Sequence, residues 1–170
     1  LVRVGPLLKE SKFPSLYQYS LNVAINIFDS KAFSNCPKQL NRTSNTYFLA
    51  NYCGDFFDLD SKYLENVKAI YDRASLIALD EGLRQKYAKH LSDIIEFDAR
   101  ILLLTLNYPQ HQRSGPPFAV SKEEVKQLFN GSFDIQELYC IEDIENEPMF
   151  QNLGVDFVEK AVYLLQKVRM

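Results

Sequence analysis

Short apolar runs alternate with amphipathic stretches along this chain, and that alternation is typical of β-α-β units. Runs rich in β-branched and aromatic residues predict strands at residues 1–4, 22–28, 46–52, 66–71, 99–106, 133–141 and 157–165. Asp29 or Ser30 is placed to cap a helix after the second of these runs. A longer helix is predicted over residues 81–97, because its apolar positions recur mainly at steps of three and four.

The later elements indicate how the strands pair. The unbroken apolar run 101–104 favours a central strand buried on both faces by helices. Ser121 and Glu124 form a capping box that opens a further helix. No clear helix separates the last two runs, so they predict an antiparallel pair. We therefore expect one domain, residues 1–170, with a doubly wound α/β fold: a mostly parallel seven-stranded sheet with one antiparallel strand.

Composition narrows the function. The 170 residues are 46% hydrophobic and 24% charged, which excludes a largely disordered chain. The formal net charge of −3 argues against a broad nucleic-acid surface. Three widely spaced cysteines, Cys36, Cys53 and Cys140, suit a reducing compartment and suggest neither a disulfide framework nor a metal site. The longest apolar run near the N-terminus is too short to cross a membrane. We expect a cytoplasmic monomer that binds neither nucleic acid nor membrane.

Ligands of doubly wound sheets bind beyond the carboxyl ends of the strands. One such loop, residues 53–59, pairs acids with aromatic residues. Asp55 could accept a hydrogen bond from an exocyclic amine, and Phe56 could stack on a flat ring. The alternative is a turn in which Asp58 caps a helix and Phe57 enters the core.

Two further strand ends carry candidate chemistry. Arg73 follows a buried strand and could clamp a carboxylate or an anionic nucleophile, or else form a structural ion pair. The loop 107–118 ends in adjacent prolines that suit the wall of a site, although a plain connection is the alternative. Within it, His111 is a possible base but more often such a histidine is simply solvated. His90 is expected on a helix surface.

Motifs of hydrolases and nucleotide-binding proteins are missing from the sequence. It contains no GxSxG elbow, no HExxH, no Walker A and no GxGxxG. The residues by themselves therefore indicate an α/β binding or transfer domain.

A family resemblance adds to this interpretation. The segments that carry it are GDFFDL (54–59), YDRASLIAL (71–79), RQKYA (84–88), ILLLTLNY (101–108), GPPFAVS (115–121) and the closing LGV and YLL (153–155 and 163–165). In order and spacing, residues 53–167 resemble the thiopurine S-methyltransferase family, a branch of the class I S-adenosylmethionine-dependent methyltransferases. Residues 46–170 match well, and residues 1–45 form a divergent cofactor-binding part.

The resemblance implies a reaction and a set of roles. A methyl group would pass from S-adenosyl-L-methionine to the sulfur of a small aromatic or heterocyclic thiol or thione. The implied cofactor-binding positions are Leu7, Asp29, Asp55, Phe56 and Arg73. Arg73 is also the implied catalytic residue, and the implied acceptor pocket consists of Pro116, Pro117 and Phe118. No metal is implied.

The N-terminal third departs from the family pattern. Family members have a Pro-Leu-Cys-Gly-Lys-Ser loop after the first strand; here Pro6, Leu7 and Ser11 match, while Lys9 stands in place of the glycine. Asp29 substitutes for the acidic residue that takes the ribose hydroxyls. The family's Trp-rich N-terminal cover is not seen in this sequence, which has 0 Trp; either the segment was lost or it lies outside this sequence.

These departures leave two alternatives. One is a non-catalytic protein that keeps the methyltransferase fold. The other is a related methyltransferase that uses halide, thiocyanate or selenium and tellurium acceptors.

Overall fold

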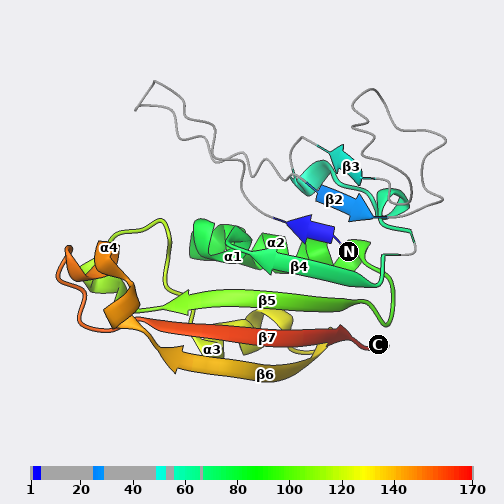
Figure 1. Cartoon of the computed structure of the whole chain (residues 1–170). Coiled ribbons are helices and arrows are strands. Elements are labelled where there is room, and N and C mark those ends of the chain that lie inside the picture. The colour runs from blue at the N-terminus through cyan, green and yellow to red at the C-terminus, as the bar shows by residue number, and fades with distance from the viewer. Residues whose placement is uncertain (1, 5–24, 29–48, 53–55, 66, 170) are drawn as a thin grey trace.

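A five-stranded sheet in the order β1-β4-β5-β7-β6 is the centre of the structure (Figure 1). The computed structural model describes residues 2–4, 25–28, 49–52, 56–65 and 67–169. The strands of the sheet are β1 (Val2–Val4), β4 (Ala69–Arg73), β5 (Arg100–Asn107), β6 (Phe133–Glu142) and β7 (Glu159–Lys167). All five coincide with predicted strands to within about three residues.

Strand direction in this sheet confirms one part of the predicted fold class. β1, β4 and β5 are parallel, with Ile70 aligned with Val2 on one side and with Ile101 on the other. β7 runs antiparallel to both β5 and β6, so it is the one reversed strand of this sheet. The mixed α/β architecture fits the class I methyltransferase fold.

The predicted single sheet of seven strands is not what the described residues form. β2 (Ile25–Phe28) and β3 (Leu49–Tyr52) pair antiparallel with each other as a separate two-stranded sheet. Alternation and β-branched residues indicate that a segment is extended. They do not specify which strand it pairs with or in which direction.

Four α-helices lie within the described residues, and side-chain caps open the two longer ones. The four are α1 (Ser75–Ala78), α2 (Glu81–Ile94), α3 (Lys122–Phe129) and α4 (Pro148–Gln151). Asp80 accepts a hydrogen bond from the Leu83 main-chain N–H at the start of α2, and Ser121 accepts one from Glu124 at the start of α3. The predicted absence of a helix between the last two strands was wrong, because α4 forms there behind a proline at its first turn.

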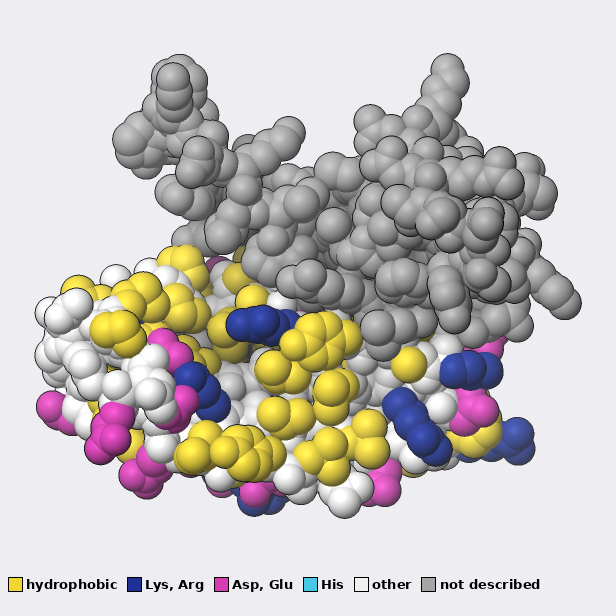
Figure 2. Space-filling model, viewed as in Figure 1, with side chains coloured by type: hydrophobic (Ala, Val, Ile, Leu, Met, Phe, Trp, Pro, Cys, Tyr) yellow, Lys and Arg dark blue, Asp and Glu magenta, His cyan; other side chains and the backbone are white. Residues whose placement is uncertain are grey.

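The main core lies between the sheet and the two long helices, α2 and α3, which lie behind the strands in Figure 1. Buried side chains such as Ile101, Tyr163 and Leu91 fill this layer. The alternate residues of the same strands, including Leu102 and Leu164, are half-buried. Hydrophobic side chains are visible on the near face of the described part in Figure 2. Among the described helices, α2 and α3 therefore cover one face of the sheet, and the predicted cover on both faces is not seen.

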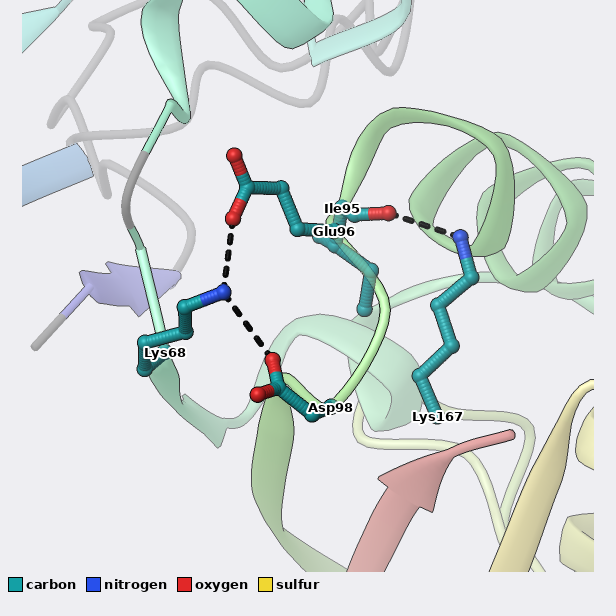
Figure 3. Close-up of polar contacts among 5 residues, drawn as sticks. All are labelled: Lys68, Ile95, Glu96, Asp98 and Lys167. Carbon is teal, nitrogen blue, oxygen red and sulfur yellow. Dashed lines mark hydrogen bonds and ion pairs between the residues drawn. The ribbon is translucent and has the colours of Figure 1, made fainter. Parts of the chain in front are cut away.

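Two lysines fix the turn between α2 and β5 (Figure 3). The ammonium group of Lys68 lies 2.7 Å from Glu96 and 3.0 Å from Asp98. Lys167, from the end of β7, donates to the carbonyl oxygens of Ser92 at 2.6 Å and Ile95 at 2.7 Å. A cation at the carboxyl end of a helix satisfies carbonyls that have no partner within the helix and also matches the helix dipole.

Replacing Lys167 is therefore expected to weaken the fold. Lys167→Met keeps most of the aliphatic stem but removes both charge-assisted hydrogen bonds, so the free energy of unfolding should fall by about 1–3 kcal/mol. Urea denaturation followed by circular dichroism measures this change. Lys89→Met is the matched control, because Lys89 makes only an exposed pair with Asp93 one turn along α2 and should change stability by less than about 0.5 kcal/mol. Equal losses in the two variants would contradict the capping role.

Candidate active site

The candidate site lies at the edge of the sheet where the parallel strands end. β4 ends at Arg73 and β5 ends at Asn107, on the left in Figure 1. The loop that follows β5 carries Pro116, Pro117 and Phe118. The main-chain N–H of Phe118 donates to the Ile77 carbonyl at 2.6 Å, which attaches this loop to α1, the helix directly after Arg73. The structure therefore brings together two of the predicted segments.

Arg73 is exposed at the end of β4, where its register partner is Leu104. The structural ion pair considered as an alternative role is not found: within the described residues, the guanidinium of Arg73 has no acidic partner. A guanidinium keeps its charge throughout the physiological range and offers five donors in a fixed fork. This side chain can receive an anionic ligand.

A buried carboxylate lies directly before Arg73. Asp72 is 1% exposed and accepts two hydrogen bonds, from the Tyr87 hydroxyl at 2.7 Å and from the Ser75 main-chain N–H at 3.3 Å. Burial raises the pKa of Asp72 to about 6, an increase that these hydrogen bonds oppose. Burial and the neighbouring Asp72 also raise the pKa of Tyr87 well above its usual value. Between Asp72 and Ser75, Ala74 has a φ of 75°, a left-handed conformation that alanine adopts only at a cost in free energy.

Phe56 opens a short 3-10 helix, Phe56–Asp58, and its ring is buried in the core. The ring centroid lies 4.7 Å from that of Tyr87 and 5.2 Å from that of His90. The interpretation of a core Phe57 is confirmed in part: Phe57 is half-buried and packs against the main core, while Phe56 is the fully buried ring. With its ring enclosed and the whole residue 1% exposed, Phe56 does not present a face for stacking, and the predicted stacking on a flat ring is not supported.

His90 also differs from its predicted position on the surface. It is half-buried, and its Nε2 lies 3.1 Å from the Leu59 carbonyl oxygen. The residues that follow Phe56 pack over this side of α2, so a position that is polar in the sequence becomes part of the interface. His111, by contrast, is exposed in the loop after β5.

Hydrogen bonds from its own side chains hold the loop after β5 in shape. The Tyr108 hydroxyl donates to the Pro117 carbonyl at 2.6 Å. Gln110 donates to the Arg113 carbonyl at 2.6 Å and accepts from the Ala119 main-chain N–H at 2.8 Å. Pro116 is exposed at the tip, while Pro117 and Phe118 are half-buried. These bonds fix the shape of the loop; its role as the wall of a site stays a prediction.

A second, smaller core supports this loop from below. It contains Leu106, Tyr108, Phe150, Val155 and Val158. The Arg113 guanidinium lies 4.8 Å from the centre of the Phe150 ring and donates to the Pro116 carbonyl at 2.8 Å. The short helix α4 therefore packs under the predicted acceptor loop.

The far end of the loop is attached to α2 and α3 by a buried arginine. Arg84 is paired with Glu124 at 2.7 Å and donates to the Ala119 carbonyl at 3.2 Å. Sequence reasoning did not single out Arg84, Asp72, Tyr87 or Gln110. The available signals were a carboxylate within an apolar strand and a cationic position on the buried side of an amphipathic helix.

Three of the predicted cofactor positions, Leu7, Asp29 and Asp55, lie outside the described residues, as does Lys9. Their roles stay predictions. None of the described helices is long and apolar enough to cross a membrane. Among the described side chains, no group of three or more histidine, cysteine or acidic residues is placed to hold a metal ion.

Comparison with known proteins identifies the family of this chain. A sequence model described as Thiopurine S-methyltransferase matches residues 14–168. The chain belongs to the thiopurine S-methyltransferase family.

Curated relatives that carry the name thiopurine S-methyltransferase come from several bacteria. The protein from Nitrosospira multiformis is 45% identical over 113 residues, which are 66% of this chain and 51% of that protein. The protein from Xanthomonas campestris pv. campestris is 42% identical over 115 residues, covering 68% and 53%. That from Pseudomonas aeruginosa is 41% identical over 114 residues, covering 67% and 52%. The chain thus spans about half the length of the curated relatives it matches.

The glycine that precedes the two prolines of this loop is expected to be essential for its shape. A Cβ at Gly115 would lie 2.6 Å from the Phe118 ring, and the φ of 78° is itself unfavourable for alanine. Gly115→Ala should lower the free energy of unfolding by about 2–4 kcal/mol. Gly131→Ala is the matched control: it has a φ of 88° but nothing within 4 Å, so it should cost only about 1–2 kcal/mol. Equal losses in chemical denaturation would show that the Phe118 contact does not matter.

Asp72 predicts a pH dependence of stability. Its pKa is about 6 in the folded chain against an ordinary value of 3.8, so between these values the folded state holds a proton that the unfolded state has released. Stability therefore falls as pH rises through this window and is level above it. Relative to Asp72→Asn, the wild-type chain should lose up to about 3 kcal/mol between roughly pH 4 and pH 7. Parallel urea titrations of the two proteins measure the difference; a constant difference would contradict the shifted pKa.

Proposed function

We propose that this chain transfers a methyl group from S-adenosyl-L-methionine to the sulfur of a small aromatic or heterocyclic thiol. Family membership supports a methyltransferase. The observation that carries the proposal is the exposed guanidinium of Arg73 at the carboxyl edge of the parallel strands, next to the loop of Pro116, Pro117 and Phe118; it has no acidic partner among the described residues. An anion-binding fork beside an apolar wall suits a flat acceptor that reacts as a thiolate.

The proposed reaction balances without an oxidant or a metal. The acceptor sulfur forms a bond to the methyl carbon as the bond between that carbon and the sulfonium sulfur breaks. The thiol proton goes to solvent, and the products are a methyl thioether and S-adenosylhomocysteine. Because the sulfonium supplies its own leaving group, the protein contributes mainly by holding the two reactants in line.

The described residues suit a protein that mainly binds and orients the two reactants. A cationic Arg73 lowers the pKa of a nearby thiol and so favours the nucleophilic thiolate. It also fits the carboxylate of the amino-acid end of the methyl donor. The exposed His111 stands in a loop of solvated polar groups, and nothing in this chemistry calls on it. A cytoplasmic, monomeric enzyme acting on a small molecule is part of the same proposal, which the exposed free thiol of Cys140 supports.

Binding of the product tests the cofactor site. Titration calorimetry of the chain with S-adenosylhomocysteine should give a dissociation constant in the micromolar range, about −8 kcal/mol. A folded sample that produces no heat would contradict the proposal and favour a non-catalytic member of the family. Profiling with heterocyclic thiols, halide, thiocyanate and selenium acceptors then identifies the class of nucleophile.

Removal of the guanidinium tests the role of Arg73. Arg73→Ala should lower kcat/KM for a thiol acceptor by roughly 10- to 100-fold, the loss expected for one hydrogen-bonded charged contact. Arg100→Ala is the matched control, because Arg100 is exposed at the opposite end of the neighbouring strand β5 and should leave kcat/KM unchanged. Full activity of Arg73→Ala would overturn the assignment.

A further inference from the structure

The turn that presents Arg73 is held from inside the protein by a single carboxylate. One Asp72 oxygen accepts from the Ser75 main-chain N–H and the other from the Tyr87 hydroxyl. Side chains of neighbouring strand residues point to opposite faces of a sheet. Asp72 therefore reaches into the core beneath Arg73, while the guanidinium leaves on the other side.

This arrangement is costly, and packing alone does not account for it. Within the described part of the chain, no lysine or arginine pairs with Asp72, so burial of the carboxylate is compensated by hydrogen bonds only. An apolar side chain at the same place in β4 would avoid that cost. What an apolar side chain cannot do is bond to the Ser75 N–H across the left-handed Ala74.

The backbone of Arg73 is fixed on both sides, by strand pairing before it and by the hydrogen bond from Ser75 to Asp72 after it. Before it, Asp72 is paired with Leu103 in β5; after it, Ala74 is held in an unfavourable conformation by the hydrogen bond to Ser75. Without that bond, Ala74 can relax to an ordinary conformation. The direction in which Arg73 leaves the strand changes with it.

Tyr87 links this turn to the short 3-10 helix that begins at Phe56, one of the predicted cofactor positions. Its hydroxyl holds Asp72, and its fully buried ring packs on Phe56, which directly follows residues 53–55. A continuous buried chain of contacts, from Phe56 to Tyr87 to Asp72 to Ser75, therefore connects the short 3-10 helix Phe56–Asp58 with the turn after β4.

We propose that Asp72, held by Tyr87, is a positioning residue that aims Arg73 at the ligand. It does not touch substrate or cofactor and acts through the turn at Ala74. This role rests on the proposed function, because it assumes that Arg73 binds the ligand. The effect of Asp72 on the conformation of the turn does not depend on that function.

A double-mutant cycle separates positioning from general support of the fold. Asp72→Ala should lower kcat/KM by roughly 10- to 100-fold, matching the loss from Arg73→Ala. In the Arg73→Ala background the same change should cost less than about 3-fold, because there is no guanidinium left to aim. If the two losses instead multiply, Asp72 does not act through Arg73 and the proposal is overturned.

The conservative variant supplies the second test. Asparagine can accept from the Ser75 N–H and donate to the Tyr87 oxygen, so Asp72→Asn should recover kcat/KM to within about 3-fold of wild type. Recovery would show that hydrogen-bond geometry matters rather than charge. Asparagine no better than alanine would overturn the proposal. Should Asp72→Ala fail to fold, Tyr87→Phe replaces it in the same cycle, with an expected loss of about 3- to 10-fold.

Amide hydrogen exchange distinguishes failure of this inference from failure of the proposed function. Asp72→Ala should speed exchange at residues 73–75 by at least about 10-fold, leave β5 and β7 unchanged, and be corrected by Asp72→Asn. If the wild-type chain has no transferase activity, the proposed function is contradicted. Faster exchange confined to residues 73–75 in Asp72→Ala would still support the positioning role. Unchanged exchange at residues 73–75 overturns it whatever the activity.

Discussion

The hydrogen bond from Tyr87 to Asp72 is the contact on which the candidate site depends. It joins α2 to β4 at 2.7 Å inside the core, where no water competes for either group. Because Asp72 has a second oxygen available, the same carboxylate also closes the turn that leads into α1. The side chain of Asp72 thus joins the helix α2, the strand β4 and the turn before α1.

The loop of Pro116, Pro117 and Phe118 is built on a different principle. Its shape comes from many neutral hydrogen bonds within the loop, several of them made by Tyr108 and Gln110, and from the small core beneath it. The two devices meet at α1, where Ile77 accepts from the Phe118 N–H. The proline loop and the turn of Arg73 are therefore joined through α1.

How far the sequence predicts this structure depends on how local each feature is. The periodic segments of α2, α3, β5 and β7 were predicted to within a few residues, because local pattern alone determines them. The reversed direction of β7 was predicted correctly, although the connection before it, residues 143–158, contains the unpredicted helix α4. The pairing of β2 with β3 was not predicted, since nothing in either segment specifies its partner. Within the site, Arg73 and the proline loop were found from their positions at strand ends.

The buried supports of the site could not be found in that way. Tyr87 fits an apolar helix face, and its hydroxyl gives no sign in the sequence that it faces a carboxylate fifteen residues earlier. Phe56 and Phe57 are adjacent aromatics, and only the three-dimensional path of the chain decides which is enclosed. Residues that meet a ligand are marked by chemistry at strand ends, whereas residues that orient them are marked by partners distant along the chain. The carboxylate of Asp72 belongs to the second group: it is adjacent to Arg73 in the sequence, but it is buried and bonded to Tyr87, fifteen residues later. A charged group in a buried position stabilises one conformation of its neighbour but lowers the stability of the fold. That combination is typical of a site that has to hold a side chain in one direction.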